Sequence, residues 1–268
     1  MLCTAFGLSI RTECALPGAM PGPPGVAPDI EIAFGVPRPW TETAAWGPYR
    51  SRDADLFEFV MPDVSRYTIQ DRHRVVITPE DGADDASIGE MLVATVLPSL
   101  LWARGEIVLH ASAIARPDRN TGLLFMGASG SGKSTRLRRA VGRGARAIAD
   151  DSVRLHIRDG ALLASGLPGG LFSGAHDLTH GRTLIPVPPG QQLKEFPVAT
   201  ALILDGDGKP PRRLTGLEAL AALLKYRHRP RILQLLGTEA DLIGPVADVA
   251  TRLRIVRIGS APRSRTIW

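Results

Sequence analysis

Apolar and polar residues alternate over several short stretches in the first 86 positions, which is the pattern of strands that bury one face. Prolines lie between these stretches and exclude a long helix in the first 50 positions. We therefore predict a smaller, β-rich N-terminal domain over residues 1–86. Its clearest strands are expected at 29–34, 56–60 and 74–78.

The spacing of apolar residues changes to three and four positions between residues 87 and 104, as on one face of a helix. Ile88, Leu92 and Val96 follow this spacing. The pattern predicts a single helix over 87–104 that links the two parts of the chain. Pro98 is the candidate position of a bend in it.

From residue 105 the pattern becomes strand, turn, helix and strand, which is typical of an α/β domain. The elements expected before residue 150 are a strand Glu106–His110 with an extension to Ala115, a strand Gly122–Met126, a loop Gly127–Gly132, a helix Lys133–Val141 and a strand Arg146–Ala149. Glycines and prolines predict loops over 161–198. Later elements are a strand at 200–204, a helix at 215–226, helices over 231–255 and a strand at 253–258. We predict one domain over 105–268.

The composition is that of a folded globular chain, because 44% of the 268 residues are hydrophobic and 22% are charged. The formal net charge of +5 is too small to indicate a nucleic-acid partner. Cys3 and Cys14 cannot form a disulfide framework or a zinc site alone and are expected in the core. The apolar stretch 91–103 is shorter than the ~20 residues of a membrane span. Without a signal-like start, the chain is expected to be cytoplasmic and to have no membrane partner.

The stretch 127–134 fits the pattern G-x-x-x-x-G-K-[ST] of a phosphate-binding loop. Its glycines let successive backbone N–H groups point into one concavity at a helix N-terminus, where phosphate oxygens bind. Lys133 brings a charge to the β- and γ-phosphates, and Ser134 brings a hydroxyl to Mg²⁺. A Gly/Ser turn that binds nothing is the alternative. We predict that ATP and Mg²⁺ are bound by Gly127, Ala128, Ser129, Gly130, Ser131, Gly132, Lys133, Ser134 and Thr135.

Two acidic residues, Asp150 and Asp151, follow the predicted strand 146–149. Ligands bind at the ends of strands in α/β sheets, so the pair should lie beside the loop. One carboxylate can then hold Mg²⁺ while the other accepts a proton from an attacking hydroxyl. Two solvated carboxylates at a turn are the alternative. His110 ends its own strand, and a parallel neighbouring strand would bring it to Asp150, although a lone histidine also suits a core position.

Two further groups of residues have weaker signals. His176 and His180 have the i, i+4 spacing of zinc ligands on a helix, but the glycines around them argue against that site. The basic cluster 227–231 is left open between a solvated surface and contact with a substrate.

Several of these residues together resemble the catalytic domain of HPr kinase/phosphorylase. The resemblance covers about residues 105–155 and is carried by Leu109–Ser112 with His110, the loop 127–134, Gly144, Ala149–Asp151 and the 17 positions from Lys133 to Asp150. It implies a P-loop catalytic domain with the fold of phosphoenolpyruvate carboxykinase, and ATP-dependent phosphorylation of a protein serine. It also implies that Asp150 is the base that takes the serine proton, with His110 beside it. Lys133 would stabilise the transferred phosphoryl group, and Asp151 and Ser134 would serve Mg²⁺.

The chain departs from that family after the Asp pair. The family's Arg-Gly-Leu-Gly segment is missing, and Gly166–Gly170 lies in its place, which puts phosphorylase activity and HPr as the substrate in doubt. The start, Ala5–Ile10, is similar to HPr-kinase-related proteins encoded with peptide-maturation enzymes, some of which resemble lasso-peptide precursor kinases. The resemblance therefore implies a serine kinase for a protein or ribosomal peptide, assembled as a homo-oligomer. A nucleotide-binding regulator without significant turnover and a small-molecule kinase are the alternatives.

Overall fold

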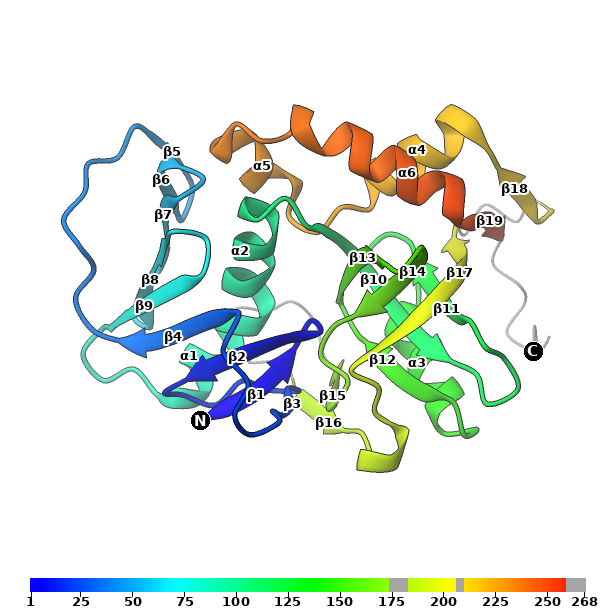
Figure 1. The fold of residues 1–268 in the computed structure, drawn as a ribbon, viewed down its shortest axis with the longest axis horizontal. Helices are drawn as coiled ribbons and strands as arrows, with labels where there is room; N and C mark the ends of the chain where they lie inside the picture. Colours follow the sequence, from blue (N-terminus) through cyan, green and yellow to red (C-terminus); the bar gives the residue numbers. More distant parts are fainter. Residues whose placement is uncertain (174–182, 206–209, 259–268) are drawn as a thin grey trace.

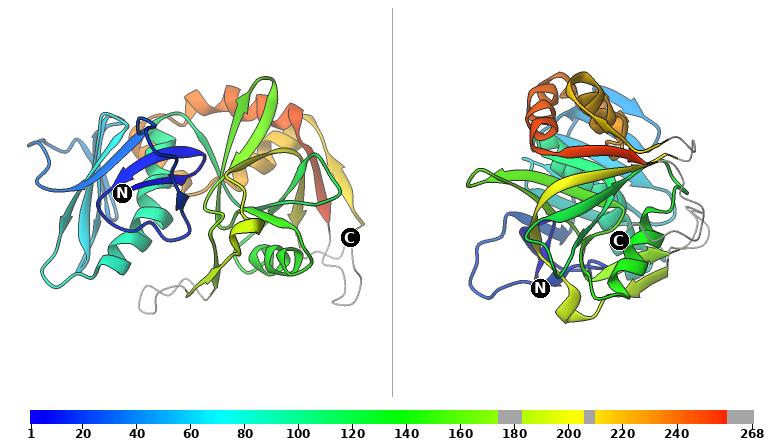
Figure 2. Two further views of the ribbon diagram at one scale, coloured as in Figure 1. Left: turned by 60° about the horizontal axis from the view of Figure 1, so that its bottom comes forward. Right: turned by 90° about the vertical axis from the view of Figure 1, so that its right-hand side faces the viewer.

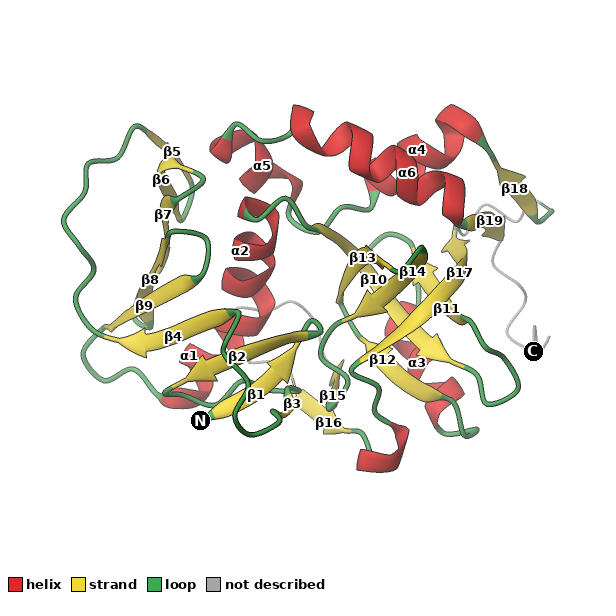
Figure 3. Ribbon diagram, in the orientation of Figure 1, coloured by secondary structure: helices red, strands yellow, loops and turns green. Residues whose placement is uncertain are grey.

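The computed structural model describes residues 1–173, 183–205 and 210–258, which form a mixed α/β structure with three sheets (Figures 1 and 3). The zinc spacing considered for His176 and His180 lies outside the described residues. The two large sheets lie at opposite ends of the molecule, and helices fill the space between and above them in the view of Figure 1.

The first sheet has nine strands, all from residues 2–79, in the order β3-β1-β2-β4-β9-β8-β7-β6-β5. They are β1 (Leu2–Ala5), β2 (Leu8–Thr12), β3 (Met20–Pro21), β4 (Ile30–Phe34), β5 (Ala44–Trp46), β6 (Tyr49–Asp53), β7 (Leu56–Met61), β8 (Ser65–Gln70) and β9 (Arg74–Pro79). The three strands predicted most clearly are confirmed as β4, β7 and β9. Alternation explains β4, because Ile30 and Ile32 are buried while Glu31 pairs with the exposed Arg11 on the other face.

A helical run follows and is divided into α1 (Asp85–Met91), a π-helical turn η1 (Leu92–Val96) and α2 (Leu97–Ala103). Asp84 caps its start by accepting the N–H of Ser87 at 2.8 Å. The predicted single helix is confirmed, but its irregularity is the π-turn that precedes Pro98. Proline has no N–H to donate to the carbonyl four residues earlier, and that carbonyl, of Ala94, accepts from Nε of Arg229 at 3.0 Å.

This helical run is the one candidate for a membrane span among the described residues. Asp85–Ala103 comprises 19 residues and is apolar enough by composition, but 72% of its apolar window is buried inside the protein. Every residue of α2 is buried. The run therefore packs as a core helix, which Figure 1 shows between the two large sheets.

The second sheet has the order β11-β10-β13-β14-β17-β19-β18, with β12 paired to β10 and β11 paired to β17. Its strands are β10 (Ile107–Ala115), β11 (Gly122–Met126), β12 (Arg146–Ala149), β13 (Ser152–Arg158), β14 (Ala161–Ser165), β17 (Glu195–Leu204), β18 (Arg212–Leu214) and β19 (Arg254–Ile258). A small separate sheet pairs β15 (Gly170–Ser173) with β16 (Thr183–Pro186). The prediction of loops over 161–198 is therefore wrong, because buried apolar residues such as Leu162 and Ala164 outweigh the glycines and prolines.

Strand β10 organises the second sheet. Its first half pairs with β13, and its second half pairs with β11 and β12, all antiparallel. The prediction of a parallel neighbour for the strand of His110 is therefore wrong. The chain instead reverses at residues 150–151 between β12 and β13, which both pair with β10. This reversal places the Asp pair beside His110.

Helices cover the second sheet on both sides (Figures 1 and 2). Helix α3 (Lys133–Val141) lies on one side, and α4 (Gly216–Lys225) and α6 (Ile243–Arg252) lie on the other. Shorter pieces are α5 (Pro230–Leu236) and the 3-10 turns η2 (Pro189–Gln191) and η3 (Ala240–Leu242). The helices predicted at 133–141 and 215–226 are confirmed. Leu217, expected on the apolar face of the later helix, is 83% exposed because the buried residues Ala219, Ala222 and Leu223 lie on the opposite face.

One hydrophobic cluster extends through both large sheets and includes Phe6, Trp102 and Ile255. Cys3 and Cys14 are buried free thiols, as predicted, and burial raises the pKa of Cys3 to about 11. Backbone contacts also join the sheets, because Phe6 donates its N–H to the carbonyl of Gly166 at 2.8 Å. The division into domains at residues 86 and 105 stays a prediction.

Candidate active site

The loop 127–132 joins β11 to α3 and has the backbone shape that only glycine adopts easily. Gly130 and Gly132 have positive φ angles of 77° and 91°. At Gly127, with φ 152°, a Cβ atom would lie 2.6 Å from Oγ of Ser131 and 2.9 Å from the carbonyl oxygen of Leu204. Oγ of Ser131 is buried and has no hydrogen-bond partner among the described residues. The loop thus surrounds a polar donor that a bound anion would satisfy.

Lys133 is folded back into this loop and is only 6% exposed. Its Nζ lies 3.0 Å from the carbonyl oxygen of Gly127, 3.1 Å from that of Ala128 and 3.0 Å from Nε2 of His110. An ammonium group has three protons to donate, so Nε2 of His110 accepts and Nδ1 of that ring carries the proton. Burial lowers the pKa of Lys133, and the nearby carboxylates of Asp151 and Asp150 oppose that shift.

Asp150 is 1% exposed and lies directly beside the start of α3. Its Oδ1 accepts from Oγ of Ser112 at 2.7 Å, from Oγ of Ser134 at 2.9 Å and from the backbone N–H of Asp151 at 3.1 Å. These donors come from β10, α3 and the chain reversal, so three elements fix one carboxylate. The buried charge is stabilised by these hydrogen bonds.

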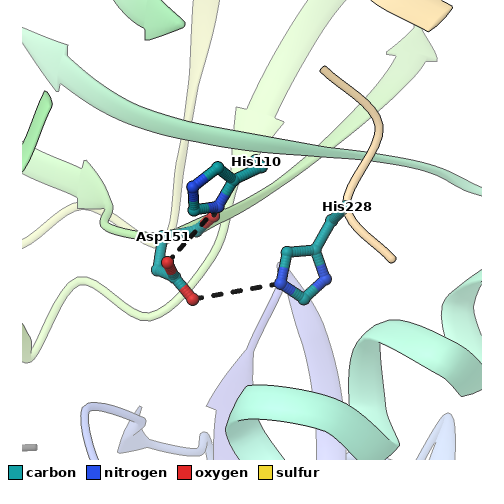
Figure 4. Close-up of side chains that lie close together, drawn as sticks. All are labelled: His110, Asp151 and His228. Atoms are coloured by element: carbon teal, nitrogen blue, oxygen red, sulfur yellow. Dashed lines mark hydrogen bonds and ion pairs between the residues drawn. The ribbon is translucent and has the colours of Figure 1, made fainter. Parts of the chain in front are cut away.

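Asp151 faces the other way, toward two imidazoles (Figure 4). Its backbone is in the left-handed region with φ 69°, which a non-glycine residue adopts at some cost. Nδ1 of His110 lies 3.2 Å from its carbonyl oxygen and 3.4 Å from Oδ1. Nε2 of His228 lies 3.9 Å from Oδ2. The carboxylate therefore lies between two histidines from distant parts of the chain.

A cavity of about 460 Å³ opens beside the two histidines that contact this carboxylate. It is lined by His110, Gly127 and Ala128 on one side and by Lys225, Tyr226, Arg227, His228 and Arg229 on the other. The segment 226–228 lies along β10, because the N–H of His110 donates to the carbonyl of Tyr226 at 2.8 Å. The cavity thus adjoins the phosphate-type loop and the two histidines that contact Asp151, and its lining is strongly basic.

The predicted site residues converge, although not in the predicted pairs. The residues His110, Lys133, Ser134, Asp150 and Asp151 form one connected group. The prediction paired Ser134 with Asp151 and His110 with Asp150, whereas the hydrogen bond of Ser134 goes to Asp150 and the ring of His110 lies against Asp151. Of the residues predicted to bind the nucleotide, Ala128, Ser129, Gly130 and Thr135 are exposed.

Sequence reasoning missed two residues of this group, Ser112 and His228. Ser112 lies in the phrase that carried the family resemblance but received no role. His228 lies in the basic cluster 227–231, for which substrate contact was left open. Only the pairing of distant segments with β10 brings His228 to the site.

Comparisons with known proteins add little to this geometry. No protein-family model matches the chain, and no curated protein matches it. Among solved structures, it is similar to the Hpr(Ser) kinase/phosphatase from Coxiella burnetii, with a TM-score of 0.34 and 15% identity, over 54% of this chain and 94% of that chain. A likeness of this size carries no argument about function, so the geometry of the site must carry the functional conclusion.

Proposed function

We propose that this protein is an ATP-dependent serine kinase that transfers the γ-phosphoryl group of Mg·ATP to a serine of a protein or peptide. The observation that carries the proposal is the convergence of Lys133, Asp150 and Asp151 at the mouth of the loop 127–134. A triphosphate bound there would end beside a carboxylate and an open cavity. Phosphoryl transfer needs this combination of charge stabilisation and a proton acceptor.

The nucleotide side is formed by the loop and helix α3. Backbone N–H groups at a helix N-terminus attract phosphate oxygens, and the buried hydroxyl of Ser131 supplies a further donor. Lys133 donates to Gly127, Ala128 and His110. Phosphate oxygens would replace some of these acceptors, and the charge of Lys133 then stabilises the transferred group.

The pair Ser134 and Asp150 fits a magnesium ion. Both offer oxygen atoms, which Mg²⁺ prefers, and these atoms lie 2.9 Å apart. Both oxygens would hold one ion in place of the hydrogen bond that joins them here. When bound, the ion would neutralise charge on the phosphate oxygens. We therefore assign Asp150 to the metal, which exchanges the order implied by the family resemblance.

Asp151 is then the proton acceptor on the side of the cavity. In the transfer, the acceptor oxygen forms a bond to the γ-phosphorus, the bond from that phosphorus to the bridging oxygen breaks, and ADP leaves with the electron pair. The acceptor proton moves to the carboxylate of Asp151. His110 holds this carboxylate from one side, because its protonated Nδ1 faces Asp151.

Transfer of labelled phosphate from ATP to a panel of serine-containing peptides and proteins, with Mg²⁺, tests the proposal. Lys133→Ala should abolish transfer, while Lys194→Ala, which changes an exposed lysine away from the site, should not. Asp151→Asn should lower kcat by about 10²- to 10⁴-fold with unchanged Mg·ATP affinity, whereas Asp150→Asn should raise the Mg²⁺ requirement. Equal activity of Lys133→Ala and the wild type would overturn the proposal. Tight ATP binding without transfer to any hydroxyl would instead support a regulator.

A further inference from the structure

The backbone of His228 is held in place by two elements that lie far from it in sequence. Its N–H donates to the carbonyl of Val108 in β10 at 2.9 Å. Its own carbonyl accepts from Nε1 of Trp102, a fully buried residue of α2, at 2.7 Å. The residue is therefore fixed by the core helix on one side and by the central strand of the second sheet on the other.

This anchoring aims the imidazole of His228 at the proposed base. The side chain is 8% exposed, and its Nε2 lies 3.9 Å from Oδ2 of Asp151. The ring of His110 lies at the other carboxylate oxygen, and the two ring centres are 6.0 Å apart. Figure 4 shows a dashed line from Asp151 to each of the two rings. Two histidines, one at each oxygen, fix the orientation of a carboxylate more firmly than a single histidine does. Rotation of the carboxylate about its Cβ–Cγ bond would break at least one of the two contacts.

The distance of 3.9 Å is longer than a hydrogen bond, which needs about 2.7–3.2 Å. Catalytic hydrogen bonds are often long before a substrate binds and shorten in the complex. His228 lines the cavity of about 460 Å³, and the carboxylate of Asp151 lies 3.9 Å behind its ring, so an acceptor that enters the cavity would exclude solvent from this contact. The hydrogen bond would then form in the absence of competing solvent.

We propose that His228 is a positioning residue for Asp151, donating from Nε2 to Oδ2 while the other oxygen receives the acceptor proton. The inference rests on the proposed function, because it gives His228 a role in that transfer. His228 forms and breaks no covalent bond in this step. Misplacing a reacting group by about 1 Å can cost on the order of 10²-fold in rate. We expect its loss to act on kcat and not on nucleotide binding.

A spectroscopic experiment on the full chain tests the contact without any acceptor. In protein labelled with ¹⁵N-histidine, the ring signals of His228 are identified by their loss in His228→Gln. Asp151→Asn should shift these signals, while Asp248→Asn, on the exposed face of α6, should leave them in place. Unmoved signals in Asp151→Asn would overturn the inference, whatever the activity of the protein.

Kinetics then test the role. His228→Ala should lower kcat about 10- to 100-fold with an unchanged KM for ATP, and His228→Gln, which keeps an N–H donor, should recover most of the rate. His73→Ala, at an exposed histidine, is the matched control. A wild-type kcat in His228→Ala would overturn the inference while the kinase proposal stands. Absence of transfer by the wild type would remove the kinase proposal, and the spectroscopic result would still decide the contact.

Discussion

The hydrogen bond from Ser112 to Asp150 should contribute measurably to stability. Ser112 is fully buried in β10, and its hydroxyl donates to a carboxylate that is 1% exposed, at 2.7 Å. A hydrogen bond to a charged group contributes about 1.5–3 kcal/mol. Ser134 and the N–H of Asp151 still hold the carboxylate in Ser112→Ala. We therefore expect a loss at the lower end of this range, about 1.5 kcal/mol.

Ser165 offers a matched control for this measurement. It is also a fully buried serine in a strand, but its hydroxyl has no hydrogen-bond partner among the described residues. Ser165→Ala removes the same atom without breaking a hydrogen bond, so its effect should stay within about 0.5 kcal/mol. Urea unfolding of the wild type and both variants, followed by tryptophan fluorescence, gives the free energies of unfolding. Equal losses in Ser112→Ala and Ser165→Ala would refute the reasoning.

Two further predictions concern packing and pH. Gly166→Ala should lower the free energy of unfolding by about 3 kcal/mol or more, because the new Cβ would lie 2.3 Å from Cβ of Ala149 and 2.8 Å from the carbonyl oxygen of Ser152. Gly190→Ala is the control, because a Cβ there would have nothing within 4 Å, and it should be close to neutral in the same urea assay. Burial, with a smaller contribution from a neighbouring arginine, lowers the pKa of His156 below its usual 6.5, so the unfolded chain takes up a proton first as the pH falls. The wild type should therefore lose stability below about pH 6.5. Urea titrations at pH 7.5 and 5.5 should show a smaller loss of stability for His156→Gln than for the wild type. Equal losses in the two proteins would count against His156 as the cause.

Signals that lie within one short stretch of sequence were sufficient for much of the fold. Helix α3 begins and ends at the predicted residues, because glycines precede and follow an amphipathic run. Strands β4, β7 and β9 were also predicted from short local patterns, although only β4 alternates in burial, whereas β7 and β9 each contain a run of buried residues. By contrast, β14 and the first half of β17, which precedes the predicted strand 200–204, were assigned to loops because of the glycines and prolines around them. Local propensity cannot show which strand will cover such a segment.

The order of the two aspartates illustrates the same limit at the site. Their position after a strand placed both beside the loop, and this prediction agrees with the structure. Which of them faces Ser134 depends on how the chain reverses at 150–151, where Asp151 takes a left-handed conformation. Successive side chains along an extended chain point to opposite sides, so a reversal shifted by one residue would exchange the directions of the two carboxylates. Sequence position alone therefore predicts the pair but not the role of each member.

The proposed nucleotide side and the proposed acceptor side of the site differ in how far apart their parts lie in the chain. On the nucleotide side, Lys133 contacts carbonyls only five and six positions earlier, so one motif encodes the geometry. On the acceptor side, Trp102 reaches His228 across 126 positions, and no contiguous pattern encodes that contact. The core helix thus fixes the acceptor side, whereas the loop fixes the nucleotide side. Because the two depend on different packing, substitutions in the first sheet or its helix should alter acceptor use more readily than ATP binding.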